Sequence, residues 1–368
     1  MTLPTAAATG VGRDAYREIP LYGSASGVAV PVDLSDNTNQ WGVPPAAARA
    51  LASLSPASAA RYPAAYAPAL NEAIATSAGV TPDMVVTGCG SDHVLDCAFR
   101  ALADPGSRVA HLDPTFVIVP SAARANSLHP VAIPWRAGGS PEAPELTVDE
   151  AALLAADARI IYLCSPNNPT GTFIPPAVIQ RIVGRASGMV ILDEAYAEFG
   201  GWSAVSMLPE APRLIVMRTF SKAFGLAGLR IGYALGQPAI VREIAKARGP
   251  YALSAFAEPA AVAALGEDID WVREKVALAI EAREKLAAAL REVGGYSVYP
   301  SAANFVMAVP DERRLPSVMS IAASLRSAGI AVRTFNDLPG IGGALRITVA
   351  PWPVMSRLLD ALPRPDRS

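Results

Sequence analysis

Lys222 is the residue of this sequence best suited to covalent chemistry. It follows an apolar run, Leu214 to Met217, that predicts a buried strand, and two hydroxyls and a glycine-rich turn flank it. In open α/β sheets, ligands bind outside the carboxyl ends of the strands. The other lysines lie in charged stretches typical of solvated helix faces: Lys246, Lys275 and Lys285. By elimination, Lys222 is the one candidate for a Schiff base with an aldehyde cofactor.

Three more polar clusters follow predicted strands: Gly88–Asp92, Asn167–Gly171 and Asp193–Tyr196. In a parallel sheet these strand ends converge on one edge. Pyridoxal phosphate needs a lysine, an acid opposite its ring nitrogen and donors for its phosphate. Asp193 is the candidate acid, because a carboxylate at the end of an apolar strand is costly unless it is paired. Its alternative role is that of a helix N-cap.

The turn Gly90-Ser91-Asp92 precedes a predicted helix, whose N-terminal N–H groups suit a phosphate. Many turns between a strand and a helix look similar, so this signal is weak alone. Arg230 could add a bidentate phosphate contact, although a structural salt bridge is an equal alternative. Thr219 and Ser221 could add hydroxyl donors.

Three other side chains fit the ring of such a cofactor. Asn168 lies in a rigid turn, Asn168-Pro169-Thr170-Gly171, and its amide could bind the ring oxygen, as could Tyr196. Phe116 could stack on the ring face, with packing in the core as an equal alternative.

Short apolar runs alternate with helical stretches from residue 84 to residue 235. This alternation predicts an α/β fold in which a mainly parallel sheet is covered by helices on both faces. A long helix, Trp271 to Val293, ends at two glycines and leads to a smaller α+β region. We expect an N-terminal arm (residues 1–35), a large domain (36–265) and a small C-terminal domain (266–368).

Composition excludes several classes of protein. The chain has 368 residues and a net charge of −2, without a basic stripe, so nucleic acid is not an expected partner. No apolar run approaches the ~18 residues of a membrane span, and the start lacks the pattern of a signal peptide. A cytoplasmic location is the expectation. Three cysteines and three histidines lack the spacing of metal ligands, so no metal is expected.

The ordered motifs Ser165–Gly171, Asp193–Tyr196 and Thr219–Arg230 resemble those of the fold-type I, class I/II aminotransferases, and within them the histidinol-phosphate aminotransferase group. The resemblance implies an aminotransferase that uses pyridoxal 5'-phosphate. Lys222 would hold the cofactor and move a proton, and Asp193 would bind the ring nitrogen. The other implied cofactor contacts are Asn168 and Tyr196 at the ring oxygen, Phe116 on the ring, and Gly90, Ser91, Asp92, Thr219, Ser221 and Arg230 around the phosphate.

The resemblance also implies substrate contacts and a partner subunit. Arg346 would clamp an anionic group of the substrate, Arg333 would assist it, and Asn37 would belong to the same site. Tyr62, in Arg61-Tyr62-Pro63, resembles a tyrosine that reaches the phosphate from the neighbouring subunit. A homodimer with shared active sites is therefore expected, acting on small amino acids and oxo acids.

Some residues depart from the group's pattern. Asp36-Asn37-Thr38-Asn39 replaces Asn-Glu-Asn-Pro, His93 replaces an acidic residue, and a Glu-Asn pair is missing from Ala350–Val354. These differences leave the identity of the substrate open between histidinol phosphate and other amino donors. The turn Gly88–Ser91 also resembles the corresponding turn of related aromatic amino-acid aminotransferases. Two alternatives to an aminotransferase remain. One is a pyridoxal-phosphate decarboxylase similar to threonine-phosphate decarboxylase, and the other is a non-catalytic ligand-sensing module.

Overall fold

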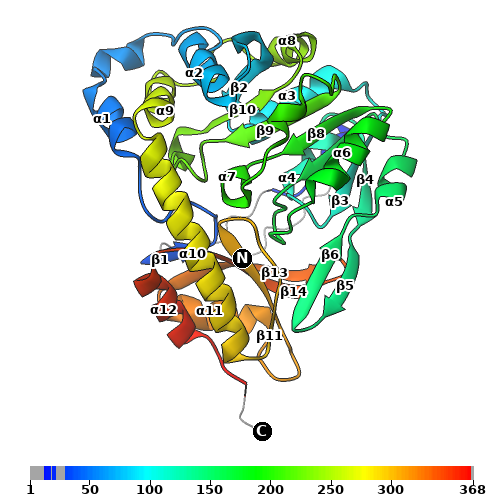
Figure 1. Ribbon diagram of the computed structural model, residues 1–368, viewed down its shortest axis with the longest axis vertical. Coiled ribbons are helices and arrows are strands. Elements are labelled where there is room, and N and C mark those ends of the chain that lie inside the picture. Colours follow the sequence, from blue (N-terminus) through cyan, green and yellow to red (C-terminus); the bar gives the residue numbers. More distant parts are fainter. Residues whose placement is uncertain (1–11, 18, 22–29, 366–368) are drawn as a thin grey trace.

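The computed structural model describes residues 12–17, 19–21 and 30–365. Figure 1 shows two regions: a large sheet with helices on both sides, and a smaller C-terminal sheet beneath it. Helix α10 (Ile269–Val293) runs from the first region to the second. The predicted arm, residues 1–35, lies partly outside the described residues, and the domain boundaries stay a prediction.

The large sheet has seven strands in the order β2-β10-β9-β8-β7-β3-β4. Their bounds are β2 Val85–Cys89, β3 Arg108–Asp113, β4 His129–Pro134, β7 Ile160–Cys164, β8 Met189–Asp193, β9 Leu214–Thr219 and β10 Ile231–Leu235. Strands β9, β8, β7, β3 and β4 are parallel, whereas β10 is antiparallel to both of its neighbours. The connection from β9 to β10, residues 220–230, is shorter than the dozen or so residues that a parallel crossover needs.

Both faces of this sheet are buried, which explains why its strands read as continuous apolar runs. On β8, Val190 and Leu192 belong to one core while Met189 and Ile191 belong to the other. The twelve α-helices of the described residues are α1 Pro45–Ser53, α2 Pro68–Ala78, α3 Ser91–Leu102, α4 Ile118–Ala125, α5 Glu150–Ala155, α6 Pro176–Arg185, α7 Ala197–Gly200, α8 Pro238–Ala247, α9 Ala257–Gly266, α10, α11 Val318–Ser327 and α12 Trp352–Ala361. Helices α3, α4 and α8 bury side chains against one face, and α2, α5, α6 and α9 against the other.

The C-terminal sheet has five strands in the order β1-β13-β14-β12-β11. Their bounds are β1 Val32–Leu34, β11 Tyr296–Val298, β12 Phe305–Pro310, β13 Ile330–Leu338 and β14 Gly342–Thr348. Strand β1 pairs with β13 in parallel, so a strand from near the start of the chain belongs to the C-terminal sheet. The chain then passes from this sheet to the large one. This crossing places residues 35–39 between the two sheets.

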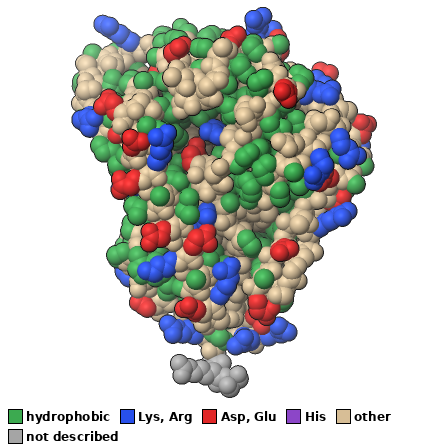
Figure 2. Space-filling view, in the orientation of Figure 1, with side chains coloured by type: hydrophobic (Ala, Val, Ile, Leu, Met, Phe, Trp, Pro, Cys, Tyr) green, Lys and Arg blue, Asp and Glu red, His purple; other side chains and the backbone are tan. Residues whose placement is uncertain are grey.

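Sequence reasoning missed several elements, among them β1, helices α4, α5, α8 and α9, and the hairpin of β5 (Arg136–Ser140) and β6 (Ala143–Thr147). The first strand of the hairpin is fully exposed and contains two glycines, so it lacks the apolar alternation that marks a strand. No helix among the described residues is both long and apolar enough to span a membrane. Acidic and basic side chains are interspersed over the face in Figure 2.

Candidate active site

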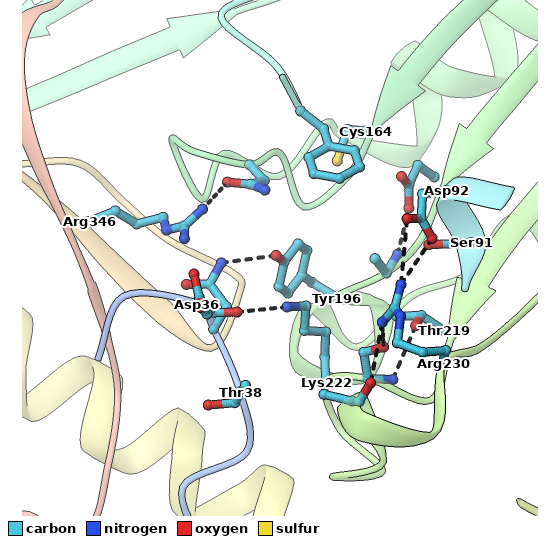
Figure 3. Close-up of a pocket in the computed structure, with 17 residues that line it drawn as sticks. Asp36, Thr38, Ser91, Asp92, Cys164, Tyr196, Thr219, Lys222, Arg230 and Arg346 are labelled. Atoms are coloured by element: carbon cyan, nitrogen blue, oxygen red, sulfur yellow. Dashed lines mark hydrogen bonds and ion pairs between the residues drawn. The ribbon is translucent and has the colours of Figure 1, made fainter. Parts of the chain in front are cut away.

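A cavity of about 310 Å³ lies at the carboxyl edge of the large sheet. The loops after β2, β3, β7, β8 and β9 meet there, and Arg230 joins them because antiparallel β10 starts at this edge. Most of the predicted site residues line the cavity: Asn37, Ser91, Asp92, Phe116, Asn168, Asp193, Tyr196, Thr219, Ser221, Lys222, Arg230 and Arg346. Figure 3 shows Lys222, Arg230 and Arg346 reaching into one space from different parts of the chain.

The position and the lowered pKa of Lys222 favour its reaction with a carbonyl group. Its Nζ donates a hydrogen bond to the backbone oxygen of Asp36 at 2.9 Å. Burial, together with the positive charge of Arg346, lowers the pKa of Lys222 to about 7. A large fraction of the amine is therefore neutral, and hence nucleophilic, at neutral pH.

Asp193 lies at the floor of the cavity with only 4 % of its surface exposed. Its Oδ2 accepts a hydrogen bond from the Tyr162 hydroxyl at 2.6 Å, and its Oδ1 accepts one from the backbone N–H of Ala195 at 3.0 Å. Burial nevertheless raises the pKa of Asp193, the two hydrogen bonds acting in the opposite direction. A cationic partner in the cavity would hold this carboxyl ionised.

The residues predicted to hold the cofactor's phosphate meet at the start of α3. Arg230 Nη2 contacts Asp92 Oδ1 at 3.1 Å, and its Nη1 lies 3.5 Å from Ser221 Oγ. Gly90 has a φ of +86°, and a Cβ atom there would collide with the Asp92 carboxylate and the Arg230 guanidinium. The turn therefore requires glycine, and it leaves space beside the N–H groups of the helix start.

The opposite wall of the cavity carries the predicted ligands of the ring oxygen. Asn168 Oδ1 accepts a hydrogen bond from Arg346 Nη1 at 2.6 Å, so its amide nitrogen is turned away from the arginine. The Tyr196 hydroxyl accepts a hydrogen bond from Asn37 Nδ2 at 2.9 Å. Burial raises the pKa of Tyr196 well above its usual value, so the hydroxyl keeps its proton and can donate it.

These residues match the donor set that pyridoxal phosphate requires. The cavity combines an amine of low pKa, a buried carboxylate, and an arginine beside a glycine-dependent helix start. Phe116 lines the same cavity, where an aromatic ring could lie against a planar cofactor.

Three predicted residues lie elsewhere. Gly90 shapes the turn without lining the cavity, and Arg333 lies on β13 opposite Arg346. Tyr62 is 83 % exposed and stacks on Tyr251, with ring centroids 4.7 Å apart. The roles predicted for Arg333 and Tyr62 stay predictions.

Sequence reasoning also missed residues that belong here. Tyr162 lies within the apolar run of β7, and Cys164, Asp36 and Thr38 line the cavity. A tyrosine inside a buried strand was a usable signal, because its hydroxyl needs a hydrogen-bond partner. Among the described residues, no group of three or more His, Cys, Asp or Glu side chains could hold a metal ion.

Comparisons with known proteins identify the family of this chain. The family model described as aminotransferase class I and II matches residues 30–362. A histidinol-phosphate aminotransferase of Roseiflexus castenholzii is 35 % identical over 355 residues, which cover 94 % of this chain and 93 % of that protein. Histidinol-phosphate aminotransferase 2 of Burkholderia mallei is 36 % identical over 358 residues, covering 95 % and 97 %.

A solved structure leads to the same family. The histidinol-phosphate aminotransferase of Sinorhizobium meliloti, crystallised with pyridoxal 5'-phosphate, superimposes with a TM-score of 0.80 and 26 % identity, covering 92 % of this chain and 91 % of that one. The predicted fold class is confirmed. The chain belongs to the class I and II aminotransferases and is a pyridoxal-phosphate-dependent enzyme of fold type I.

Proposed function

We propose that this enzyme transfers an amino group from a substrate with an anionic end to a 2-oxo acid. By similarity to the relatives named above, the donor would be L-histidinol phosphate, with 2-oxoglutarate as the acceptor. The turn Gly88–Ser91 keeps an aromatic amino acid as the alternative donor to the same acceptor. The observation that carries the proposal is that Lys222, Asp193 and Arg346 line one cavity. They supply a nucleophilic amine, an acid and an anion clamp.

Different residues of the cavity would bind the cofactor and move the proton. Arg230, Ser91 and Ser221 would hold the cofactor's phosphate, and Asp193 would hold its ring nitrogen. When bound, the cofactor supplies an electron sink that stabilises negative charge at the substrate's Cα. Lys222 Nζ would take the proton from the substrate's Cα and deliver it to the cofactor's C4′, which its pKa of about 7 allows at neutral pH.

A screen of single substrates tests the proposal. The holoenzyme would be mixed with individual amino acids or with histidinol phosphate, and loss of the cofactor's visible absorption band would be recorded. We expect rapid loss with the true donor and recovery of the band with 2-oxoglutarate. Release of carbon dioxide without a ketone product would instead support the decarboxylase alternative and contradict amino transfer.

Arg346 gives a prediction about substrate charge. Its side chain is 7 % exposed and reaches the cavity from β14. Because a guanidinium binds an anion through two hydrogen bonds, Arg346→Lys should raise KM for anionic donors roughly 10- to 100-fold. KM for a neutral amine should change little. Steady-state kinetics with matched anionic and neutral donors measures both.

The control for this prediction is Arg49→Lys, which changes an exposed arginine that pairs with Glu267 away from the cavity. Equal rises in KM for both donor types in the Arg346 variant would remove its role in charge recognition.

We also propose a cytoplasmic homodimer in which Tyr62 completes the partner's phosphate site. Tyr62 stacks on Tyr251, which is 49 % exposed, and Tyr66, which is 42 % exposed, donates its backbone N–H to the oxygen of the adjacent Pro250. Such rings are enriched in interfaces between proteins.

Subunit mixing tests the shared site. Lys222→Ala and Tyr62→Ala subunits, unfolded and refolded together, should regain activity that neither parent has. The reason is that one site of each mixed dimer would combine an intact lysine with an intact tyrosine. Tyr16→Ala, which changes an exposed tyrosine away from this cluster, is the control for Tyr62→Ala. A monomeric mass, or no gain on mixing, would contradict the shared site.

A further inference from the structure

Asn37 lies at the junction of the two sheets and makes contacts through all of its polar groups. It is fully buried, and its φ of +54° is a left-handed conformation that asparagine tolerates better than most residues. Its backbone N–H donates to Thr348 Oγ1 at 3.0 Å, and its backbone oxygen accepts from Asn304 Nδ2 at 3.0 Å. Its side chain lies between the hydroxyls of Thr348 and Tyr196.

These contacts fix the direction of each hydrogen bond. Thr348 Oγ1 accepts the backbone N–H of Asn37, so its single proton is available for Asn37 Oδ1 at 3.2 Å. Within the described part of the chain, this hydroxyl has no other acceptor. Asn37 must then present Nδ2 to Tyr196, at 2.9 Å. The Tyr196 oxygen is therefore an acceptor here, and its own proton is free for another partner.

We propose that Asn37 is a positioning residue that directs the Tyr196 hydroxyl proton into the cavity, with Thr348 setting the orientation of the Asn37 amide. Asn37 was predicted from the sequence as a substrate-binding residue, and this inference gives it a different task. It rests on the proposed role of Tyr196 as a donor to the ring oxygen of the cofactor. Strand β14, which carries both Thr348 and Arg346, thus acts on the cofactor as well as on the substrate.

The consequence concerns protonation of the cofactor. A hydrogen bond donated to the anionic ring oxygen stabilises that anion, and so lowers the pH at which the bound chromophore loses its proton. Turning the Tyr196 proton away from the cavity should raise that pH. The observable is the midpoint of the pH titration of the holoenzyme's visible absorption band, which requires no turnover.

Asn37→Asp is the sharpest test, because the two side chains have the same shape. A carboxylate cannot donate, so the Tyr196 hydroxyl would donate to residue 37 and no longer to the cavity. We expect the midpoint to rise by about one pH unit. Thr348→Val should shift it in the same direction, whereas Thr348→Ser, which keeps the hydroxyl, should leave it in place. An unchanged midpoint in Asn37→Asp or Thr348→Val would overturn the inference.

A double-mutant cycle separates two effects of Asn37→Asp on the midpoint: redirection of the Tyr196 proton, called the relay below, and the added negative charge. In a Tyr196→Phe background no hydroxyl is left to redirect, so Asn37→Asp should have little further effect. An equal shift in both backgrounds would mean that charge alone acts, and would overturn the relay. If Tyr196→Phe alone leaves the midpoint unchanged, the proposed role of Tyr196 fails, and the relay fails with it. Asn71→Asp, which makes the same substitution in α2 away from the cavity, should not shift the midpoint.

Discussion

Lys222→Ala is expected to abolish covalent attachment of the cofactor and to lower kcat by a factor of about 10⁴. The other three lysines, all of them in the part of the chain that the structure describes, lie outside the cavity, so none of them can replace this one. Borohydride reduction of the holoenzyme, followed by peptide mass spectrometry, should place the modified lysine at residue 222 in the native chain. The same treatment of the variant should give no modified peptide.

Lys246→Ala is the matched control, since that lysine is exposed and pairs with Glu243 on α8. This variant should keep the adduct and full activity. An adduct on another lysine in Lys222→Ala would refute the assignment.

The pH dependence of covalent cofactor binding follows from the burial of Lys222. Because burial lowers the pKa of Lys222 to about 7, its amine becomes neutral as the pH rises through that value. The rate at which apoenzyme binds pyridoxal phosphate covalently should therefore increase from pH 6 to pH 8. A rate that rose only near the ordinary lysine pKa, about 10.4, would contradict this environment.

Asp193→Asn should lower kcat roughly 10²- to 10³-fold and weaken cofactor binding, because a neutral amide cannot stabilise a positive ring nitrogen. Tyr162→Phe should act in the same direction but less, by about tenfold, since it removes one hydrogen bond to the charged carboxylate. Cofactor affinity, measured by titrating apoenzyme, reports both effects without turnover.

A cofactor analogue methylated at the ring nitrogen provides the control, because its positive charge is permanent. It should restore part of the lost activity in Asp193→Asn. An equally large loss with both cofactors would show that Asp193 acts through structure instead of charge. Tyr233→Phe removes another buried hydroxyl, one that lies near Arg218 outside the cavity, and should leave cofactor affinity unchanged.

Local sequence patterns determined the strands of the large sheet and several residues of the active site. Apolar runs marked β7, β8 and β9 because strands covered on both faces contain few polar residues. The parallel arrangement of those strands makes their polar ends converge, so the sequence alone assigns Lys222, Asp193 and Asn168 to one site. Lysine scarcity singled out Lys222, since each alternative lay in a charged helix.

Tertiary structure decided what depends on contacts between distant segments. The short loop before β10 reversed that strand and brought Arg230 to the same edge as the parallel strand ends. The pairing of β7 with β8 in register brought the Tyr162 hydroxyl to Asp193. A tyrosine in an apolar run does not reveal its partner, because the partner lies on a neighbouring strand.

The loop that contains Asn37 makes the same distinction clear. Its composition reads only as a turn, yet β1 pairs with β13 and so lays this loop across the cavity. There the backbone of Asp36 meets Lys222, and Asn37 meets Tyr196 and Thr348. Sequence determines which chemical groups a chain possesses and where its strands end. Only the packing of one sheet against the other determines which of those groups donate to which, because hydrogen bonds require distances and directions that no local pattern contains.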